Sequence, residues 1–195
     1  MKVVAAYWVV TAWLLTFAAG QQPTASVSEV HRLYTEDQAD RGVGGKALPS
    51  EQVELRDRER RIHVHAMLES GKLKTAEDFH DAAFVYQHGH DPEEYLLAHV
   101  LATVAVQKGD AKSLWISAAT LDRYLHAIGQ PQVFGTQYSN RGDGPFTQAP
   151  YNRDLIPDDL RAVFCVPDLD QQRENIKAFN VGQYPERMIP PGCTR

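Results

Sequence analysis

The stretch EEYLLAHVLATVAVQKG, residues 93–109, decides the fold. It follows Pro92, which suits the first turn of a helix because the N–H that proline lacks has no partner there. From Tyr95 to Val106 the stretch is apolar on nearly every side. Because a helix that is hydrophobic all round is buried, we expect this helix to be the central and most buried element.

Helical patterns continue on both sides of this stretch. Three helices are predicted before it, over residues 26–41, 50–70 and 75–89. One long helix is predicted after it, over residues 111–128, followed by two short ones over residues 158–164 and 170–179. Ser50 is suited to cap the second helix, and Thr75 with Asp78 forms a short capping box for the third. The charged run ELRDRERR, residues 54–61, is interpreted as a solvated helix face rather than a binding patch.

Two later segments have a different character. Residues 131–151, PQVFGTQYSNRGDGPFTQAPY, place aromatic and β-branched residues around a Gly-rich turn, which predicts a short irregular β-hairpin. Residues 181–195, VGQYPERMIPPGCTR, are Pro-rich and are expected to be extended. The predicted fold class is therefore mainly α, a compact bundle of about five helices with a short irregular β-hairpin and a Pro-rich C-terminal tail.

The composition is that of a globular protein. The chain has 195 residues, of which 43% are hydrophobic and 23% are charged, and its formal net charge is −5. An acidic chain without a basic stripe is a poor match to a nucleic-acid-binding protein, so no nucleic-acid partner is expected. Residues 21–195 are long enough for one mainly helical domain with its own core.

The N-terminus has the pattern of a secretory signal peptide. Lys2 precedes an uncharged run over residues 3–17, and the small residues Ala18, Ala19 and Gly20 follow it. The alternative is a single membrane anchor, which needs about 20 consecutive apolar residues, and this run is shorter. We expect residues 1–20 to be removed, leaving a secreted or periplasmic protein with no stable membrane span.

Export makes the two cysteines informative. Cys165 and Cys193 have no metal-ligand spacing, and an even number of cysteines in an oxidising compartment favours one disulfide. Two unpaired thiols are the alternative. A disulfide would stabilise the fold by roughly 3–4 kcal/mol in the chain-entropy treatment.

Several polar residues are candidates for chemistry. His88 is expected at the C-terminus of the third helix, where the helix dipole favours a protonated imidazole; a plain helix cap is the alternative. Asp122 and Arg123 lie near the end of the fifth helix, where a structural ion pair is the alternative to a functional role. The loop amides that follow either hold backbone groups or grip a polar substrate. The histidines match no zinc signature, so neither a metal nor a cofactor is predicted.

Four short motifs carry a resemblance to a known family. They are Asp37-Gln38 with Arg41, Gln87-His88, Asp122-Arg123, and the segment GQPQVFGTQ over residues 129–137. Together they resemble a family of bacterial proteins described only as a domain of unknown function, over about residues 30–165. The resemblance implies a helical fold, often with an export signal, and no established reaction.

Two functional hypotheses follow if the bundle brings these residues together. In the first, the protein is a binding module that holds a peptide, a glycan or a small polar ligand in a polar cleft between helix ends and the GTQ loop. In the alternative, the same cleft is that of a hydrolase in which His88 and Asp122 perform general acid–base catalysis. The predicted binding residues are Asp37, Gln38, Arg41, Gln87, Arg123, Gln132, Thr136 and Gln137.

Overall fold

The computed structural model describes residues 28–140, 142–185, 188–190 and 192–193, and these residues are mainly helical. They contain seven α-helices and no β-strand. The helices are α1 (Glu29–Asp40), α2 (Ser50–Glu69), α3 (Ala76–Tyr86), α4 (Pro92–Gln107), α5 (Ser113–Ala127), α6 (Asp158–Val163) and α7 (Leu169–Asn180). The predicted signal peptide, residues 1–20, lies outside the described residues.

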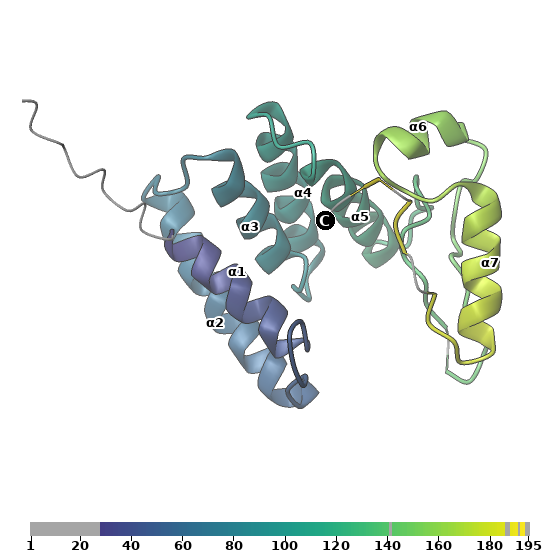
Figure 1. Ribbon diagram of the computed structural model, residues 1–195, viewed down its shortest axis with the longest axis horizontal. Helices are drawn as coiled ribbons and strands as arrows, with labels where there is room; N and C mark the ends of the chain where they lie inside the picture. The colour runs from purple at the N-terminus through teal and green to yellow at the C-terminus, as the bar shows by residue number, and fades with distance from the viewer. Residues whose placement is uncertain (1–27, 141, 186–187, 191, 194–195) are drawn as a thin grey trace, which may run out of the picture.

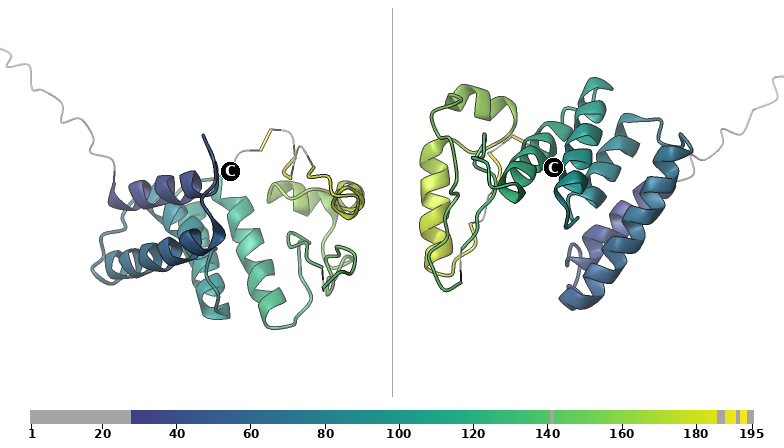
Figure 2. Two further views of the ribbon diagram at one scale, coloured as in Figure 1. Left: turned by 90° about the horizontal axis from the view of Figure 1, so that it is seen from below. Right: turned by 180° about the vertical axis from the view of Figure 1, so that it is seen from behind.

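The helices follow one another across the molecule nearly in chain order. α1 and α2 lie side by side at one end, α3, α4 and α5 form the middle, and α6 and α7 lie at the other end (Figures 1 and 2). α3 contacts α1, α2 and α4, and α4 lies between α3 and α5. The seven helices exceed the expected bundle of about five because α6 and α7, the two short predicted helices, form a separate layer beyond α5.

The expectation that residues 93–109 form the most buried element is wrong. α4 is central, but only its small-residue face is buried, through Ala98, Ala102 and Ala105 with Leu101 beside them. Leu96 and Val100 are 38% and 49% exposed. The most buried helix is α3, because α1, α2 and α4 all pack against it, whereas α4 has helical neighbours mainly on two sides.

Local end signals explain where the helices begin. The capping box of Thr75 and Asp78 is present at α3, and Pro92 occupies the first turn of α4, both as predicted. Ser50 is the first residue of α2 rather than its cap; Pro49 precedes it, and no side chain caps this end. The amides of Gln52 and Val53 both donate to the Pro49 carbonyl instead, at 3.0 and 3.1 Å.

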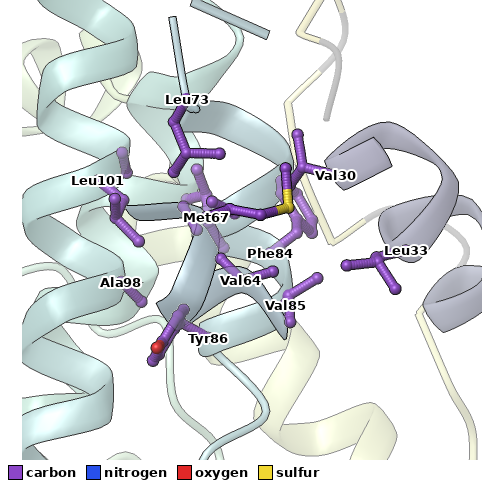
Figure 3. Close-up of a cluster of buried hydrophobic side chains, with 14 residues drawn as sticks. Val30, Leu33, Val64, Met67, Leu73, Phe84, Val85, Tyr86, Ala98 and Leu101 are labelled. Atoms are coloured by element: carbon purple, nitrogen blue, oxygen red, sulfur yellow. The ribbon is translucent and has the colours of Figure 1, made fainter. Parts of the chain in front are cut away.

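The main hydrophobic core forms where the first four helices meet. Val30 and Leu33 from α1 face Val64 and Met67 from α2, and the side chains of α3 lie between them (Figure 3). Leu101 closes the cluster from α4. Each such fully buried side chain contributes roughly 1.5–3 kcal/mol relative to an exposed one, so this core fixes the ends of α1, α2 and α3 near one another.

A second, smaller core joins the C-terminal part to α5. It contains Ala118 of α5, Phe134 of the following loop and Val166 after α6. The rings of Phe134 and Phe164 are 4.8 Å apart between their centroids. Trp115 packs against both cores, so α5 is the element through which the two halves of the fold are joined.

The predicted β-hairpin over residues 131–151 is not formed as a pair of strands. Ser139 and Thr147 form one isolated antiparallel bridge, with two backbone hydrogen bonds of 2.9 and 2.8 Å. The ladder does not extend because side chains take the backbone amides that a hairpin would use. Asp122 accepts hydrogen bonds from three amides of this segment, and Gln132 accepts one from a fourth.

The C-terminal part is held by the predicted disulfide. Cys165 and Cys193 are bonded, so the alternative of two free thiols is excluded. The expectation of an extended tail over residues 181–195 is not confirmed, since residues 186–187, 191 and 194–195 lie outside the described part. Within the described residues, no helix combines the length and the apolarity needed to cross a bilayer.

Candidate functional site

A network of buried charges fills the space between α1 and α2. Arg41 pairs with Asp37 at 2.7 Å and with Asp57 at 2.6 Å. Arg60, whose side chain is buried, pairs with Asp57 at 3.1 Å and with Asp40 at a short distance. Each of these carboxylates therefore has at least one guanidinium partner, which offsets the cost of removing the charges from water.

This network corrects part of the interpretation of residues 54–61 as a solvated face. Asp57, Arg60 and Arg61 of that run are buried. Leu55, in the same run, is 62% exposed. α2 therefore buries three charged residues of this run, and the exposed residues of the run are Glu54, Leu55, Arg56, Arg58 and Glu59.

His88 lies beside the network as a neutral imidazole. Its Nε2 atom is 3.6 Å from the Asp37 carboxylate, and this nitrogen has no hydrogen-bond partner among the residues that the structure describes. Burial lowers the pKa of His88 to about 2, and the positive charges of Arg41 and Arg123 contribute. The 3.6 Å contact is consequently not an ion pair, and the expected protonation of His88 by a helix dipole is outweighed by desolvation.

Asp37 is the carboxylate closest to that imidazole. It accepts hydrogen bonds from Arg41 at 2.7 Å and from Gln38 at 2.7 Å. Burial nevertheless raises the pKa of Asp37 to about 6, although Arg41 and Gln38 act in the opposite direction. The first predicted motif, Asp37-Gln38 with Arg41, thus forms one connected group with His88.

Asp122 belongs to a different group, formed with the loop that follows α5. Its Oδ1 accepts hydrogen bonds from the backbone amides of Val133 and Phe134 at 2.7 and 3.0 Å. Its Oδ2 accepts from both the amide and the hydroxyl of Thr136 at 2.9 Å. Burial raises the pKa of Asp122 against these bonds. This carboxylate clamps the loop after α5.

The side chains of two glutamines in this loop, Gln132 and Gln137, add further hydrogen bonds to those of Asp122. Gln132 donates to the carbonyls of Gln137 and Gln148 at 3.0 and 2.7 Å and accepts from the Gln137 amide at 2.9 Å. Gln137 donates to the Ala119 carbonyl at 3.1 Å. These side chains satisfy backbone groups of an irregular loop, which is the alternative that the sequence left open for them.

The predicted site residues therefore fall into two groups rather than one. Among the described residues, His88 and Asp122 share no hydrogen bond. The Asp122 carboxylate is bonded to the loop after α5, whereas the His88 imidazole lies beside Asp37. Arg123 lies with the first group: its guanidinium is 5.7 Å from the centre of the Tyr95 ring, and its charge lowers the pKa of His88. Adjacent helical residues point about 100° apart, so Asp122 and Arg123 face different groups. Gln87 is buried beside His88.

A groove lies outside the charged network, between α2, the end of α3 and the start of α4. Its volume is about 960 Å³. Leu55 and Ile62 of α2 line it, together with Tyr86 of α3 and Leu97 of α4. Leu55 and Ile62 are seven residues apart, so they share one helix face, and they are 62% and 59% exposed.

Acidic residues surround the apolar part of this groove. The carboxylates that line it belong to Glu51, Glu54, Asp91, Glu93 and Glu94. Two arginines also line it, and one of them, Arg61, is bonded to Glu94 at 2.7 Å and to the His88 carbonyl at 2.8 Å. The groove therefore has an excess of negative charge. A signal in the sequence is the seven-residue spacing of Leu55 and Ile62 within a charged helix; of the two, only Leu55 lies in the run 54–61 that is interpreted as a solvated face.

Comparisons with known proteins add no identification. No family model matches the chain, and no curated protein and no solved structure matches it either.

Proposed function

We propose that the protein is a binding module that holds a basic amphipathic helix of a partner protein in the groove between α2 and α4. The observation that carries this proposal is the exposure of Leu55 and Ile62, two large apolar side chains of α2 that line the groove. Large apolar side chains that line a concave surface, rimmed by polar groups, are typical of sites where another protein docks.

The shape of the groove favours a helical segment. Its α2 wall runs from Glu51 to His65, a length of about 21 Å at 1.5 Å per residue. An amphipathic helix of about 15 residues has this length, and it would place an apolar stripe with i, i+3, i+4 and i+7 spacing against Leu55 and Ile62. A short helix therefore matches the length and the apolar pattern of the wall.

The negative charge of the groove favours a partner helix whose polar face is basic. Glu51, Glu54 and Glu93 stand at the rim without an arginine or lysine bonded to them among the described residues. Lysine or arginine side chains flanking the apolar stripe of the partner would complement them and would accelerate association. An acidic or uncharged helix lacks this complement.

The cellular compartment limits which partners the protein can meet. The Cys165–Cys193 disulfide is compatible with an oxidising, extracytoplasmic environment. Together with the predicted signal peptide, it supports a partner that is itself secreted or periplasmic. The resemblance to bacterial proteins of unknown function agrees with such a location and remains a prediction.

The hydrolase alternative has less support. Both oxygens of Asp122 are occupied by the loop after α5. His88 has a pKa of about 2 because it is buried among arginines, which makes its imidazole a weak base at neutral pH. In the proposed binding module, the group around Asp37 instead holds α2 in place, and the group around Asp122 holds the loop after α5.

A labelled peptide of about 15 residues, with leucines on one helical face and lysines on the other, tests the proposal by fluorescence anisotropy. We expect saturable binding to the intact chain that weakens with added salt, because exposed charge pairs are screened. Ile62→Ser and Leu55→Ser should each weaken binding at least about fivefold, since each removes an apolar contact worth roughly 1 kcal/mol or more.

The matched control is Leu155→Ser, because Leu155 is 56% exposed and lies outside the groove. It should bind the peptide as the wild type does. A second probe, in which every lysine is replaced by glutamate, should not bind. Equal binding of both probes, or an equal loss of affinity in Leu155→Ser, would refute the proposed site.

A further inference from the structure

We propose that His31, Glu77 and Asp81 form a binding site for a divalent transition-metal ion such as Zn²⁺. The three side chains come from two helices that pack together, His31 from α1 and the other two from α3. One potential ligand atom from each lies within 4.8 Å of the others. This site is separate from the α2–α4 groove, and it does not depend on the proposed function.

The spacing of the donor atoms suits a small cation. His31 Nδ1 is 2.8 Å from Asp81 Oδ2 and 3.7 Å from Glu77 Oε1. In a tetrahedral zinc site, ligand atoms at about 2.1 Å from the metal are about 3.4 Å from one another. The two distances lie on both sides of that value, and the side chains that must adjust to complete the site are an exposed glutamate and a half-exposed histidine.

The helix register aims both carboxylates at one point. Glu77 and Asp81 are four residues apart, so they occupy the same face of α3. α1 packs against that face and presents His31. The imidazole directs Nδ1 toward both carboxylates, which leaves one ring nitrogen for the metal and the other for solvent or a second contact.

Asp81 is the buried carboxylate with the least compensation. Its side chain is only 2% exposed, and its hydrogen bond is to His31. Asp37, Asp40 and Asp57 are each paired with arginine. Among the described residues no lysine or arginine pairs with Asp81, and a buried anion without a cation is costly. A metal ion would supply the missing positive charge.

A cavity of about 450 Å³ gives access to the three groups. His31, Glu77 and Asp81 line it, and His80 and Asp110 lie across it, where His80 Nδ1 is 2.9 Å from Ser113 Oγ and 3.2 Å from Asp110 Oδ2. Three protein ligands leave at least one coordination position of zinc open to this cavity. A mixed nitrogen and oxygen donor set favours Zn²⁺ or Co²⁺ over Mg²⁺, which prefers oxygen ligands.

The test uses the full chain, freed of metal by a chelator and carrying no polyhistidine tag. Calorimetric titration with Zn²⁺ should show one saturable site, and Mg²⁺ should not compete for it. Asp81→Asn and His31→Gln should each weaken that site at least about tenfold, since even partners one shell further out cost 10–100-fold. Co²⁺ bound by the wild type should give visible absorption that both variants lose.

His65→Gln is the matched control, because it removes another imidazole that stands 3.4 Å from a glutamate, Glu69, on an exposed helix face. It should leave the Zn²⁺ affinity unchanged. If Asp81→Asn does not fold, Glu77→Gln takes its place, since Glu77 is 71% exposed and its substitution leaves the core intact. Zn²⁺ affinity within about twofold of the wild type in His31→Gln and Glu77→Gln, or Mg²⁺ bound in preference to Zn²⁺, would overturn the site.

Discussion

Replacing His88 with glutamine tests whether this imidazole is held neutral among the arginines. Burial lowers the pKa of His88 to about 2 in the folded protein, whereas an unfolded histidine has a pKa of about 6.5. The unfolded state therefore binds a proton that the folded state does not. The stability linked to His88 is fully present above pH 6.5 and is lost as the pH falls below that value.

The magnitude follows from the two pKa values. At pH 5 the proton taken up by the unfolded state lowers the free energy of unfolding by about 2 kcal/mol, and at pH 7.5 by nearly nothing. The folded-state value hardly matters, because any pKa well below 5 gives the same result. His88→Gln removes this dependence, so its free energy of unfolding relative to the wild type should rise by about 2 kcal/mol between pH 7.5 and pH 5.

Urea unfolding of both proteins at a series of pH values measures this difference. Burial raises the pKa of Asp37 and of Asp81 to about 6, so these two carboxyl groups stabilise the folded state as the pH falls. In the wild type alone, this gain would partly mask the loss of stability caused by His88. The comparison with His88→Gln removes the contribution of the two carboxyl groups. His63→Gln, which removes an exposed imidazole, should track the wild type at every pH. A difference between His88→Gln and wild type that stays constant within about 0.5 kcal/mol would show that His88 titrates normally in the folded protein.

Three further predictions concern the C-terminal half. Asp122→Ala should lower the free energy of unfolding by at least about 3 kcal/mol in urea titrations, because three backbone amides lose their acceptor; a loss below about 1 kcal/mol would mean that water replaces the carboxylate. Gly135→Ala should cost at least about 2 kcal/mol, since φ is +78° and a Cβ atom would lie 2.5 Å from Gln172 Oε1. The Gly135→Ala variant should have a lower melting temperature than the wild type, and an unchanged melting temperature would contradict the close contact between residue 135 and Gln172. Reducing the Cys165–Cys193 bond should remove about 3–4 kcal/mol, as expected for a sequence separation of 28 residues, and a Cys165→Ser, Cys193→Ser double variant should show the same loss without reductant.

Features that depend on neighbouring residues in the chain could be predicted from the sequence. The capping box of Thr75 and Asp78 and the position of Pro92 were correct because each depends on backbone groups within one helical turn. The disulfide is confirmed; its prediction rested on the two cysteines of the chain and on the expected oxidising compartment, which favours their pairing. These local signals also gave the order of the helices.

Features that depend on which helix faces which could not be predicted. The run ELRDRERR appears solvated in isolation, and only the approach of α1 with Asp37, Asp40 and Arg41 gives its charges buried partners. The sequence placed Asp122 near a loop of polar residues, but it could not show that backbone amides would occupy both oxygens. His31 and Asp81 were not connected because 50 positions separate them in the chain.

The double contact of Arg61 has a consequence for how a partner would be chosen. This side chain holds α2 to Glu94 and to the His88 carbonyl at the corner between α3 and α4. The width of the groove is thereby set before any peptide arrives, which reduces the conformational entropy lost in association. If the groove holds a helix as proposed, a receptor braced in this way would select its partner by fit: a helix with bulkier side chains would be rejected, because the walls cannot part without breaking the two hydrogen bonds of Arg61.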